Sequence, residues 1–390
     1  MKPSPKPSSG AATASSIHRH FTSLPDPRVK RTREHLLLDL VTIGILAVIG
    51  GAKGWDDMEV YAKAHEAWLR QFLALPGGAP SDDTFRRLFV RLNAKAFGSC
   101  FTAWMSELIG TTAGKLIAID GKTLRGSFDC ASGRTALHLV HAWVAENRVL
   151  LGQCATSEKS NEITAIPELI DLLDLKGSVV TIDAMGCQKK IVEKIIEKGA
   201  DYAIALKGNQ EKLHDEVAGY LDAAIADGGA RVFETRNEGH GRQEVRRLYA
   251  VSQVEWLSAF DDWPGLRSLV CVERERTVKG KTSVERVHYI TSIPAHHVRR
   301  LARITRGHWS VENDLHWSLD VSFAEDACRI RSGSGPENFG LLRRIALVLL
   351  RRETSMRAGA PTKQFRAAND PNYALRVLLT GIPAESRDGR

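Results

Sequence analysis

Three acidic residues lie in sequence settings that could bring carboxylates together. Asp120 follows the apolar run 116–119, and Asp183 follows the similar run 179–182. Both runs are rich in β-branched residues, as buried strands are. Glu312 lies instead in a segment with helical periodicity. A carboxylate at the end of a buried strand is costly to desolvate unless a cation or a hydrogen-bond donor meets it.

Such a set of carboxylates is suited to phosphoryl transfer on nucleic acid. Two strand-end Asp residues and a helix-borne Glu could hold two Mg²⁺ (or Mn²⁺) ions about 3.5–4 Å apart, as two-metal phosphodiester chemistry requires. Asp120, Asp183 and Glu312 are therefore the candidate catalytic residues and metal ligands. A single strand-end Asp more often caps the next turn, so the prediction depends on two of them being neighbours.

The order of elements around the two Asp residues predicts a mixed sheet. Helical periodicity at 162–175 and 188–198 marks two crossover helices, and period-2 patterns indicate strands at 116–120, 136–145, 149–156, 178–183 and 202–206. Three meandering strands followed by two that the crossovers add would make the first and fourth strands parallel neighbours. Asp120 and Asp183 would then end side by side.

The chain before this sheet reads as helical from 17 to 112. Apolar patterns predict helices at 36–49 and 55–75, and Ser81 can cap a third that carries Arg86, Arg87 and Arg91. Two helices joined by a short turn, the second of them basic, could enter a DNA groove. A plain helical bundle with solvated arginines is the alternative.

The chain after the sheet predicts an insertion and a helical end. A helix at 211–226 precedes four strand-like runs at 231–235, 243–251, 267–276 and 283–291, which together suggest a β-rich insertion at about 211–292. Helical patterns then return at 296–319, 338–352 and 373–379. We expect a disordered tail at 1–16, a helical domain at 17–112, an α/β catalytic domain at 113–380, and a short tail at 381–390.

Composition narrows the class of protein. The net charge of +8 and pI near 9.2 favour an anionic partner such as double-stranded DNA, although many mildly basic proteins bind no polyanion. The six cysteines are scattered and form no C-x-x-C pair, which fits a reducing cytoplasm better than a zinc ribbon. The most apolar stretch, 36–51, is shorter than the roughly 20 residues that span a bilayer, so we expect no membrane partner.

Three segments carry a resemblance to a known family. IAIDGKTLRGS (117–127), VTIDAMGCQ (180–188) and RGHWSVENDLHWSLDVSFAEDACRIR (306–331) are similar to signatures of the H-repeat-associated (ISAs1) family of DDE insertion-sequence transposases. The resemblance covers 17–380. It implies an RNase H-like core with a β insertion, a DDE-associated N-terminal domain, and a DDE triad at Asp120, Asp183 and Glu312.

The same resemblance implies a function. A protein of this family would bind terminal inverted repeats, cleave DNA with divalent metal, and join the freed 3′-OH to target DNA. It would work as a homodimer on paired ends, in the bacterial cytoplasm at the nucleoid. Two alternatives stay open, namely an RNase H-like DNA nuclease without strand transfer and an inactive DNA-binding relic.

The chain departs from the family's wider pattern around the third acid. The related Tyr-x2-Arg-x3-Glu-x6-Lys motif would fall on Thr305, His308, Glu312 and Leu319. We therefore expect Arg306 and His308 to supply phosphate contacts. Because His308, Glu312, His316 and Asp320 recur every four residues, they would share one helical stripe. A zinc site made by the first three is a weaker alternative, since oxygen ligands at the strand ends favour Mg²⁺.

Other residues have candidate roles at this stage. Lys122, Arg125 and Lys207 follow strand ends and could contact phosphate. On the helix 338–352 the apolar residues would face the core, and we expect outward-facing arginines that bind DNA, Arg343 and Arg344 among them. Trp143, Trp309 and Trp317 are predicted to be core residues. The acids after Glu312 (Asp320, Glu325 and Asp326) would pair with Arg329 and Arg331 or assist the metals, and the turn at His240 and Arg242 could touch DNA.

Overall fold

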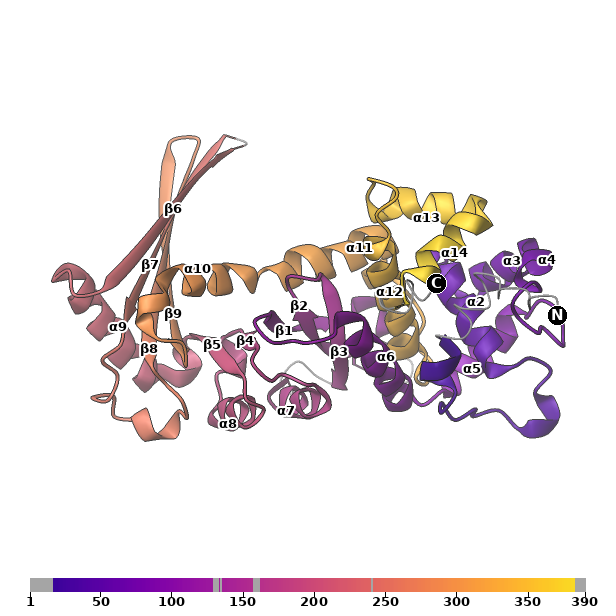
Figure 1. The fold of residues 1–390 in the computed structure, drawn as a ribbon, viewed down its shortest axis with the longest axis horizontal. Helices are drawn as coiled ribbons and strands as arrows, with labels where there is room; N and C mark the ends of the chain where they lie inside the picture. Colours follow the sequence, from indigo (N-terminus) through magenta and orange to yellow (C-terminus); the bar gives the residue numbers. More distant parts are fainter. Residues whose placement is uncertain (1–16, 129–132, 134, 157–161, 240, 383–390) are drawn as a thin grey trace, which may run out of the picture.

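The computed structural model describes residues 17–128, 133, 135–156, 162–239 and 241–382, and it shows a long molecule with a helical end and a β-rich end (Figure 1). The predicted tails lie outside the described residues, except for 381 and 382, and so does His240. The fold is mixed α/β, with one large sheet. No helix in these ranges is both long and apolar enough to cross a membrane.

The sheet has nine strands in the order β3-β2-β1-β4-β5-β9-β8-β7-β6. Its first part is the predicted mixed sheet. β1, β2 and β3 form an antiparallel meander, whereas β1 pairs with β4, and β4 with β5, in parallel. The crossover helices are α7 (Glu162–Leu172) and α8 (Lys189–Glu197). The strands are β1 (Leu116–Thr123), β2 (His138–Val144), β3 (Val149–Thr156), β4 (Val179–Ile182) and β5 (Asp201–Leu206).

The predicted β-rich insertion extends this same sheet. After α9 (Glu211–Ala226), four antiparallel strands follow, and the last of them pairs with β5. Their far ends project beyond the body of the molecule (Figure 1). They are longer than the sequence pattern indicated, because the residues at their outer ends are exposed or only partly buried and lack a regular alternation of apolar and polar side chains. The strands are β6 (Arg231–Gly239), β7 (Arg242–Val251), β8 (Ser268–Val278) and β9 (Lys281–Thr291).

The helical end is built from both ends of the chain (Figure 1). The N-terminal helices pack against helices that follow the third acid, with α12 in contact with α2, α5 and α6. The helices of this part are α2 (Leu37–Ile49), α3 (Trp55–Ala64), α4 (Glu66–Leu69), α5 (Asp82–Arg91), α6 (Ala94–Ile109), α12 (Gly335–Arg352), α13 (Ala360–Asn369) and α14 (Pro371–Leu379).

The single helix predicted over 55–75 is wrong. The chain leaves helical geometry at His65 and ends the segment at Leu75, which has a left-handed φ of 41°. The Leu75 N–H donates to the buried carboxylate of Asp39 at 2.9 Å. A tertiary hydrogen bond therefore fixes this turn, and no local pattern announces it. The predicted cap of the next helix is confirmed, since Ser81 Oγ accepts from the Thr84 N–H.

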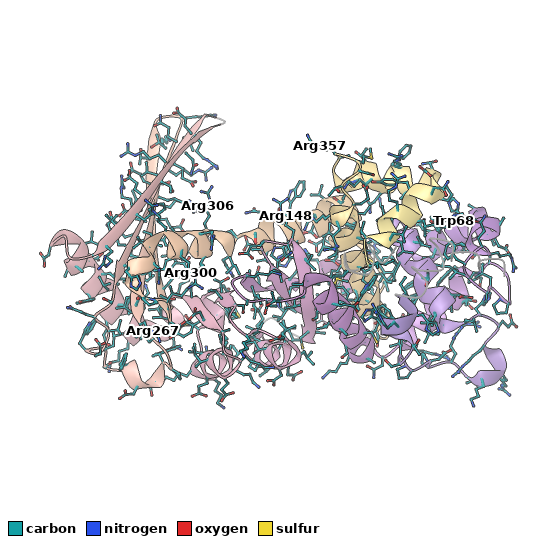
Figure 2. The ribbon with its side chains drawn as sticks, viewed as in Figure 1. Trp68, Arg148, Arg267, Arg300, Arg306 and Arg357 are labelled. Atoms are coloured by element: carbon teal, nitrogen blue, oxygen red, sulfur yellow. The ribbon has the colours of Figure 1, made fainter. Side chains whose placement is uncertain are left out.

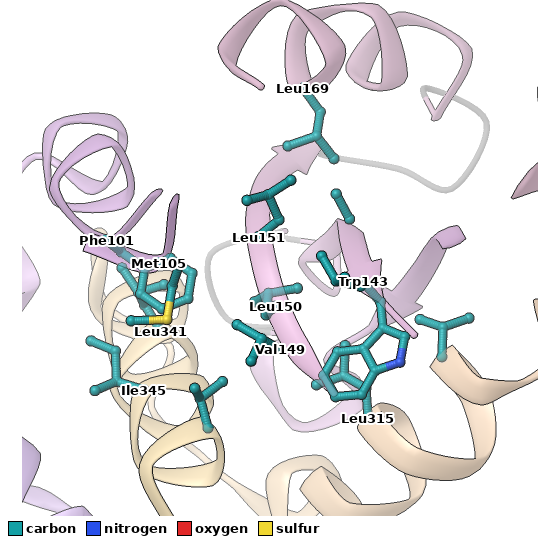
Figure 3. Packing of buried hydrophobic residues seen from close by; sticks show 14 of the residues in the cluster. Phe101, Met105, Trp143, Val149, Leu150, Leu151, Leu169, Leu315, Leu341 and Ile345 are labelled. Carbon is teal, nitrogen blue, oxygen red and sulfur yellow. The ribbon is translucent and has the colours of Figure 1, made fainter. Parts of the chain in front are cut away.

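The core joins the sheet to the helical end (Figure 3). Phe101 and Met105 of α6 lie beside Leu341 of α12, opposite side chains of β3. Trp143 on β2 is fully buried, which confirms that prediction. The matching prediction for Trp309 and Trp317 is wrong, because they are 44% and 60% exposed.

The segment that carries the third acid is three consecutive helical pieces. α10 (Val298–Gly307) leads into a π-helical turn (Val311–His316), and α11 (Trp317–Phe323) follows. Within the turn the Trp317 N–H donates to the Glu312 carbonyl, five residues back. Val311 and Leu315 fill the side that faces the core, which leaves the neighbouring tryptophans outside. Such π-turns often occur at functional sites.

Candidate active site

The register of β1 and β4 places the first two acids next to each other. Ile119 pairs with Ile182 in the parallel ladder, so Asp120 and Asp183 are the next residues on strands that lie about 4.8 Å apart. Asp183 Oδ1 also accepts from the N–H groups of Met185 (3.1 Å) and Gly186 (3.4 Å). The capping role is therefore real, and it holds the carboxyl group at the strand end.

The third acid belongs to the same region. The pKa of Asp120 rises to about 7, first because the residue is buried, and then because of the charges of Asp183, Glu312 and Glu162. The Gly121 N–H, which donates to Asp120 Oδ1 at 2.9 Å, opposes this rise. Glu312 itself is exposed on the π-helical turn. The structure thus brings the predicted acids close enough to interact electrostatically.

No cationic side chain among the described residues forms an ion pair with Asp120. His316 Nδ1 lies 3.6 Å from Asp120 Oδ2, but burial lowers the pKa of His316 to about 3, so its ring is neutral. Lys122 is directed elsewhere, since its Nζ contacts both Asp320 oxygens at 2.8 and 2.7 Å. Among the described residues, no Lys or Arg side chain therefore neutralises the Asp120 carboxyl group when it ionises.

Hard oxygen donors with uncompensated charge fit a Mg²⁺ or Mn²⁺ ion. Within the described ranges, no three His, Cys, Asp or Glu side chains are already gathered as a ligand set. The structure does not support the alternative zinc site, because the side chains of His308, Glu312 and His316 point in different directions. His308 Nδ1 contacts Thr181 Oγ1 at 3.1 Å, His316 faces β2, and Glu312 faces solvent. Burial lowers the pKa of His308 to about 4.

The site contains a fourth acidic residue, Glu162, which the sequence pattern did not identify. Glu162 begins α7, is 4% exposed, and places Oε1 2.5 Å from His138 Nε2. A Cβ added to Gly121 would lie 2.3 Å from both of these atoms. The glycine that follows Asp120 is therefore required by a close approach of side chains. That glycine was visible in the sequence, but the approaching pair was not.

The expectation that Arg343 and Arg344 face outward is wrong, and the structure does not present them as DNA contacts. Arg343 and Arg344, expected to face outward, are 2% and 0% exposed. α12 is buried on nearly all sides, because the sheet lies against one face and the N-terminal helices against another. Arg343 lies over the ring of Phe339, and Arg344 pairs with Glu325 at 2.7 Å. Neither side chain is available to DNA in this structure.

The other predicted basic contacts differ in exposure. Lys122 is buried against Asp320, whereas Arg125, Lys207 and Arg306 are exposed. Arg125 also lies 3.5 Å from Asp326. Their contact with phosphate stays a prediction.

The acids after Glu312 do not pair as expected. Asp320 binds Lys122, Glu325 binds Arg344, and Asp326 lies 3.6 Å from Lys122. The prediction that Arg329 and Arg331 would be the partners is therefore wrong. These ion pairs connect the third-acid segment to β1 and to α12.

Two adjoining hollows run from the insertion to the third acid. The first, about 360 Å³, lies between α10 and the β6–β9 face, with an apolar floor that includes Leu248 and Tyr289. The second, about 490 Å³, includes Glu312 and Asp314 in its lining. Asp120 and Asp183 are absent from both linings. Both hollows share four residues, which are Arg246, Arg274, Arg306 and Trp309.

The basic residues of these hollows include two without protein partners. Among the described residues, nothing forms a hydrogen bond or ion pair with Arg303 or Arg306, and both are exposed. Arg306 lies on the side of α10 toward the raised strands (Figure 2). Arg299 lies over the Phe233 ring at 5.8 Å. We call this surface, lined by Arg246, Arg274, Arg299, Arg303, Arg306 and Trp309, the arginine groove.

Comparisons with known proteins agree on one family. The family model "Transposase DDE domain" matches 111–349, and the model "DDE_Tnp_1-associated" matches 18–105. The chain is 40% identical over 370 residues to "Putative transposase YncI" of Escherichia coli O157:H7, covering 94% of this chain and 95% of the relative. It is 38% identical over 368 residues to "H repeat-associated putative transposase YhhI" of Escherichia coli (strain K12), covering 93% and 97%.

A solved structure of a piggyBac transposase synaptic complex with hairpin DNA shows a distant likeness. The TM-score is 0.41 at 10% identity, over 90% of this chain and 75% of that chain.

Proposed function

Because the chain belongs to the DDE transposase family, we propose that it is the transposase of an insertion sequence in the H-repeat-associated (ISAs1) group. It would bind the terminal inverted repeats of its element, cleave DNA there, and join the 3′-OH ends to target DNA. The strand order β3-β2-β1-β4-β5 supports the proposal that the core is RNase H-like. The domain limits at 17–112 and 113–380 belong to this proposal.

One observation carries the proposed chemistry, namely the parallel register that sets Asp120 beside Asp183, with Glu312 in electrostatic range. These three acids would hold the divalent cations. Such ions, when bound, supply Lewis acidity to the reacting phosphodiester. The protein's part is to fix the donors. The Gly121 N–H holds Asp120 Oδ1, and the backbone after β4 holds Asp183 Oδ1.

The arginine groove is the proposed path of DNA toward the acids. It leads along α10 to Glu312, and within the described ranges the guanidinium groups of Arg303 and Arg306 have no hydrogen-bond or ion-pair partner, whereas Arg246 and Arg274 pair with Glu244 and Glu285. Arginine forks match phosphate geometry, and each phosphate neutralised steepens the dependence of binding on salt. A homodimer on paired ends, located at the nucleoid, completes the proposal.

A strand-transfer assay tests the function. Duplexes that carry the ends of the element, pre-cut to expose the 3′-OH, are incubated with Mg²⁺ and a supercoiled target plasmid. We expect joined products from the wild type and none from Asp183→Asn, whose amide oxygen can still cap the turn and whose binding to the ends persists. Hydrolysis without joining would identify a nuclease. Binding without either reaction would identify a relic.

A separate binding experiment tests the groove. The double change Arg303→Ala and Arg306→Ala should weaken binding to any duplex and lower the salt slope by about 2. Arg300→Ala is the matched control, because Arg300 lies on the same helix, outside both hollows, 3.6 Å from Asp201. Equal salt slopes for the double variant and the wild type would remove the groove from the proposal.

A further inference from the structure

A chain of buried polar side chains connects Asp120 to the interior of α12. Asp120 and His141 are direct partners in the β1–β2 ladder, so their side chains lie on one face of the sheet. His316 reaches the same place from the π-helical turn. Arg344 reaches it from α12, and the Glu325 oxygens hold its guanidinium at 2.7 and 3.2 Å. Arg344, His141 and Glu325 are at most 1% exposed.

The hydrogen-bonding chemistry of these side chains determines which atom donates and which accepts in each hydrogen bond of the chain. A guanidinium donates hydrogen bonds and cannot accept them, so His141 Nε2, 2.9 Å from Arg344 Nε, is an unprotonated acceptor. His141 must then carry its proton on Nδ1, because a ring without either proton does not occur at neutral pH. Burial, together with the charge of Arg344, holds the pKa of His141 well below its usual value.

The protonation of the His316 ring follows from that of the His141 ring. His141 Nδ1 lies 3.2 Å from His316 Nε2, so the His141 N–H donates and His316 Nε2 accepts. His316 therefore carries its proton on Nδ1, and this is the atom 3.6 Å from Asp120 Oδ2. That distance is longer than a hydrogen bond, but it places the positive end of an N–H dipole beside the carboxylate.

We propose that Arg344 and His141 are positioning residues, which act through His316 to orient the Asp120 carboxylate for metal binding. The relay Arg344–His141–His316 faces Oδ2, while the Gly121 N–H holds Oδ1. Both oxygens keep lone pairs for a cation. Partners that orient a ligand in this way typically change metal affinity by 10–100-fold. The inference rests on the proposed function, since metal binding by Asp120 is part of it.

The protonation pattern is tested on the metal-free wild type, without DNA. Nitrogen-15 spectra of protein labelled at its 13 histidines distinguish protonated from unprotonated ring nitrogens. Spectra of His141→Gln and His316→Gln identify the two sets of signals. We expect both rings to be neutral with the proton on Nδ1. A proton on Nε2 of either ring would overturn the relay.

Two variants of His316 separate positioning from packing. The amide of His316→Asn lies near the place of Nδ1, so it keeps a donor toward Asp120 and loses the acceptor for His141. The amide of His316→Gln lies near the place of Nε2, so it keeps that acceptor and loses the donor. The relay predicts that the Gln variant melts at the higher temperature and yet binds Mn²⁺ about tenfold more weakly than the Asn variant.

The ranking of the two variants by melting temperature is compared with their ranking by Mn²⁺ affinity. If Mn²⁺ affinity follows melting temperature, the histidine is structural and the relay is refuted. The spectra and the Mn²⁺ titrations use neither DNA nor turnover. A failure of strand transfer would therefore remove the proposed function without changing either result, and the two failures can be told apart.

Discussion

Replacing Asp120 by Asn is expected to stabilise the metal-free protein at neutral and alkaline pH. The carboxyl group has a pKa of about 7 in the folded protein, against its ordinary value of 3.8. Between these values the folded protein holds a proton that the unfolded chain has released. The free energy of unfolding therefore falls as the pH rises through this window. Below this pH window the folded protein bears no free-energy cost for ionising Asp120, and above about pH 7 it bears the full cost.

The size of the effect follows from the same two values. One pKa unit corresponds to 1.36 kcal/mol, so the interval from 3.8 to about 7 is worth at most about 4 kcal/mol. The amide of the variant cannot ionise and escapes this cost, while its oxygen can still accept from the Gly121 N–H. Placing the new NH₂ group beside His316 can change the free energy of unfolding, but this change is the same at the low and high ends of the pH range.

The assay is urea denaturation in EDTA, at about pH 4.5 and about pH 8, extrapolated to zero denaturant. The stability difference between Asp120→Asn and wild type should be about 3 kcal/mol more favourable to the variant at the higher pH. Asp215→Asn is the control, because that side chain is 74% exposed. Added Mg²⁺ should stabilise the wild type more than the variant. Equal differences at both pH values would show that the Asp120 carboxyl group has the same pKa in the folded and the unfolded protein.

Three further substitutions test separate parts of the structure. Glu312→Gln should lower DNA cleavage by at least about 100-fold while changing stability by under about 0.5 kcal/mol in a melt, since the residue is exposed. Gly121→Ala should cost about 1–3 kcal/mol in urea denaturation, because the methyl group meets Glu162 and His138; an unchanged midpoint would contradict that contact. Ser81→Ala should cost about 1 kcal/mol by the same assay through loss of the α5 cap, and no loss would show that the cap is replaced by water.

The mixed sheet could be predicted because its signals are local and its topology is constrained. Buried parallel strands read as short apolar runs, and the rules for crossover connections then leave few arrangements. The adjacency of β1 and β4 followed from this, and with it the expected proximity of Asp120 and Asp183. Glu312 could be placed in a helical segment, but the π-helical turn around it has no distinct sequence period.

The features that were predicted wrongly or missed share one cause, which is contact between distant parts of the chain. Arg344 stands on a helix whose apolar pattern suggested one solvated face, yet packing buries the whole helix. Its partner Glu325 and its neighbour His141 come from separate elements. Glu162 likewise reaches the site from the start of α7. Pairings of this kind depend on the assembled fold, and a single sequence does not encode them in any local pattern.

In the proposed function, Asp120, Asp183 and Glu312 together hold divalent cations for DNA chemistry. The most direct test is anomalous diffraction from crystals of the protein bound to element-end DNA and soaked in Mn²⁺. We expect Mn²⁺ peaks at roughly 2.0–2.3 Å from carboxylate oxygens of both Asp120 and Asp183, with Glu312 at the same cluster. Ordered side chains at all three positions, with Mn²⁺ bound elsewhere or absent at saturating concentration, would contradict this expectation.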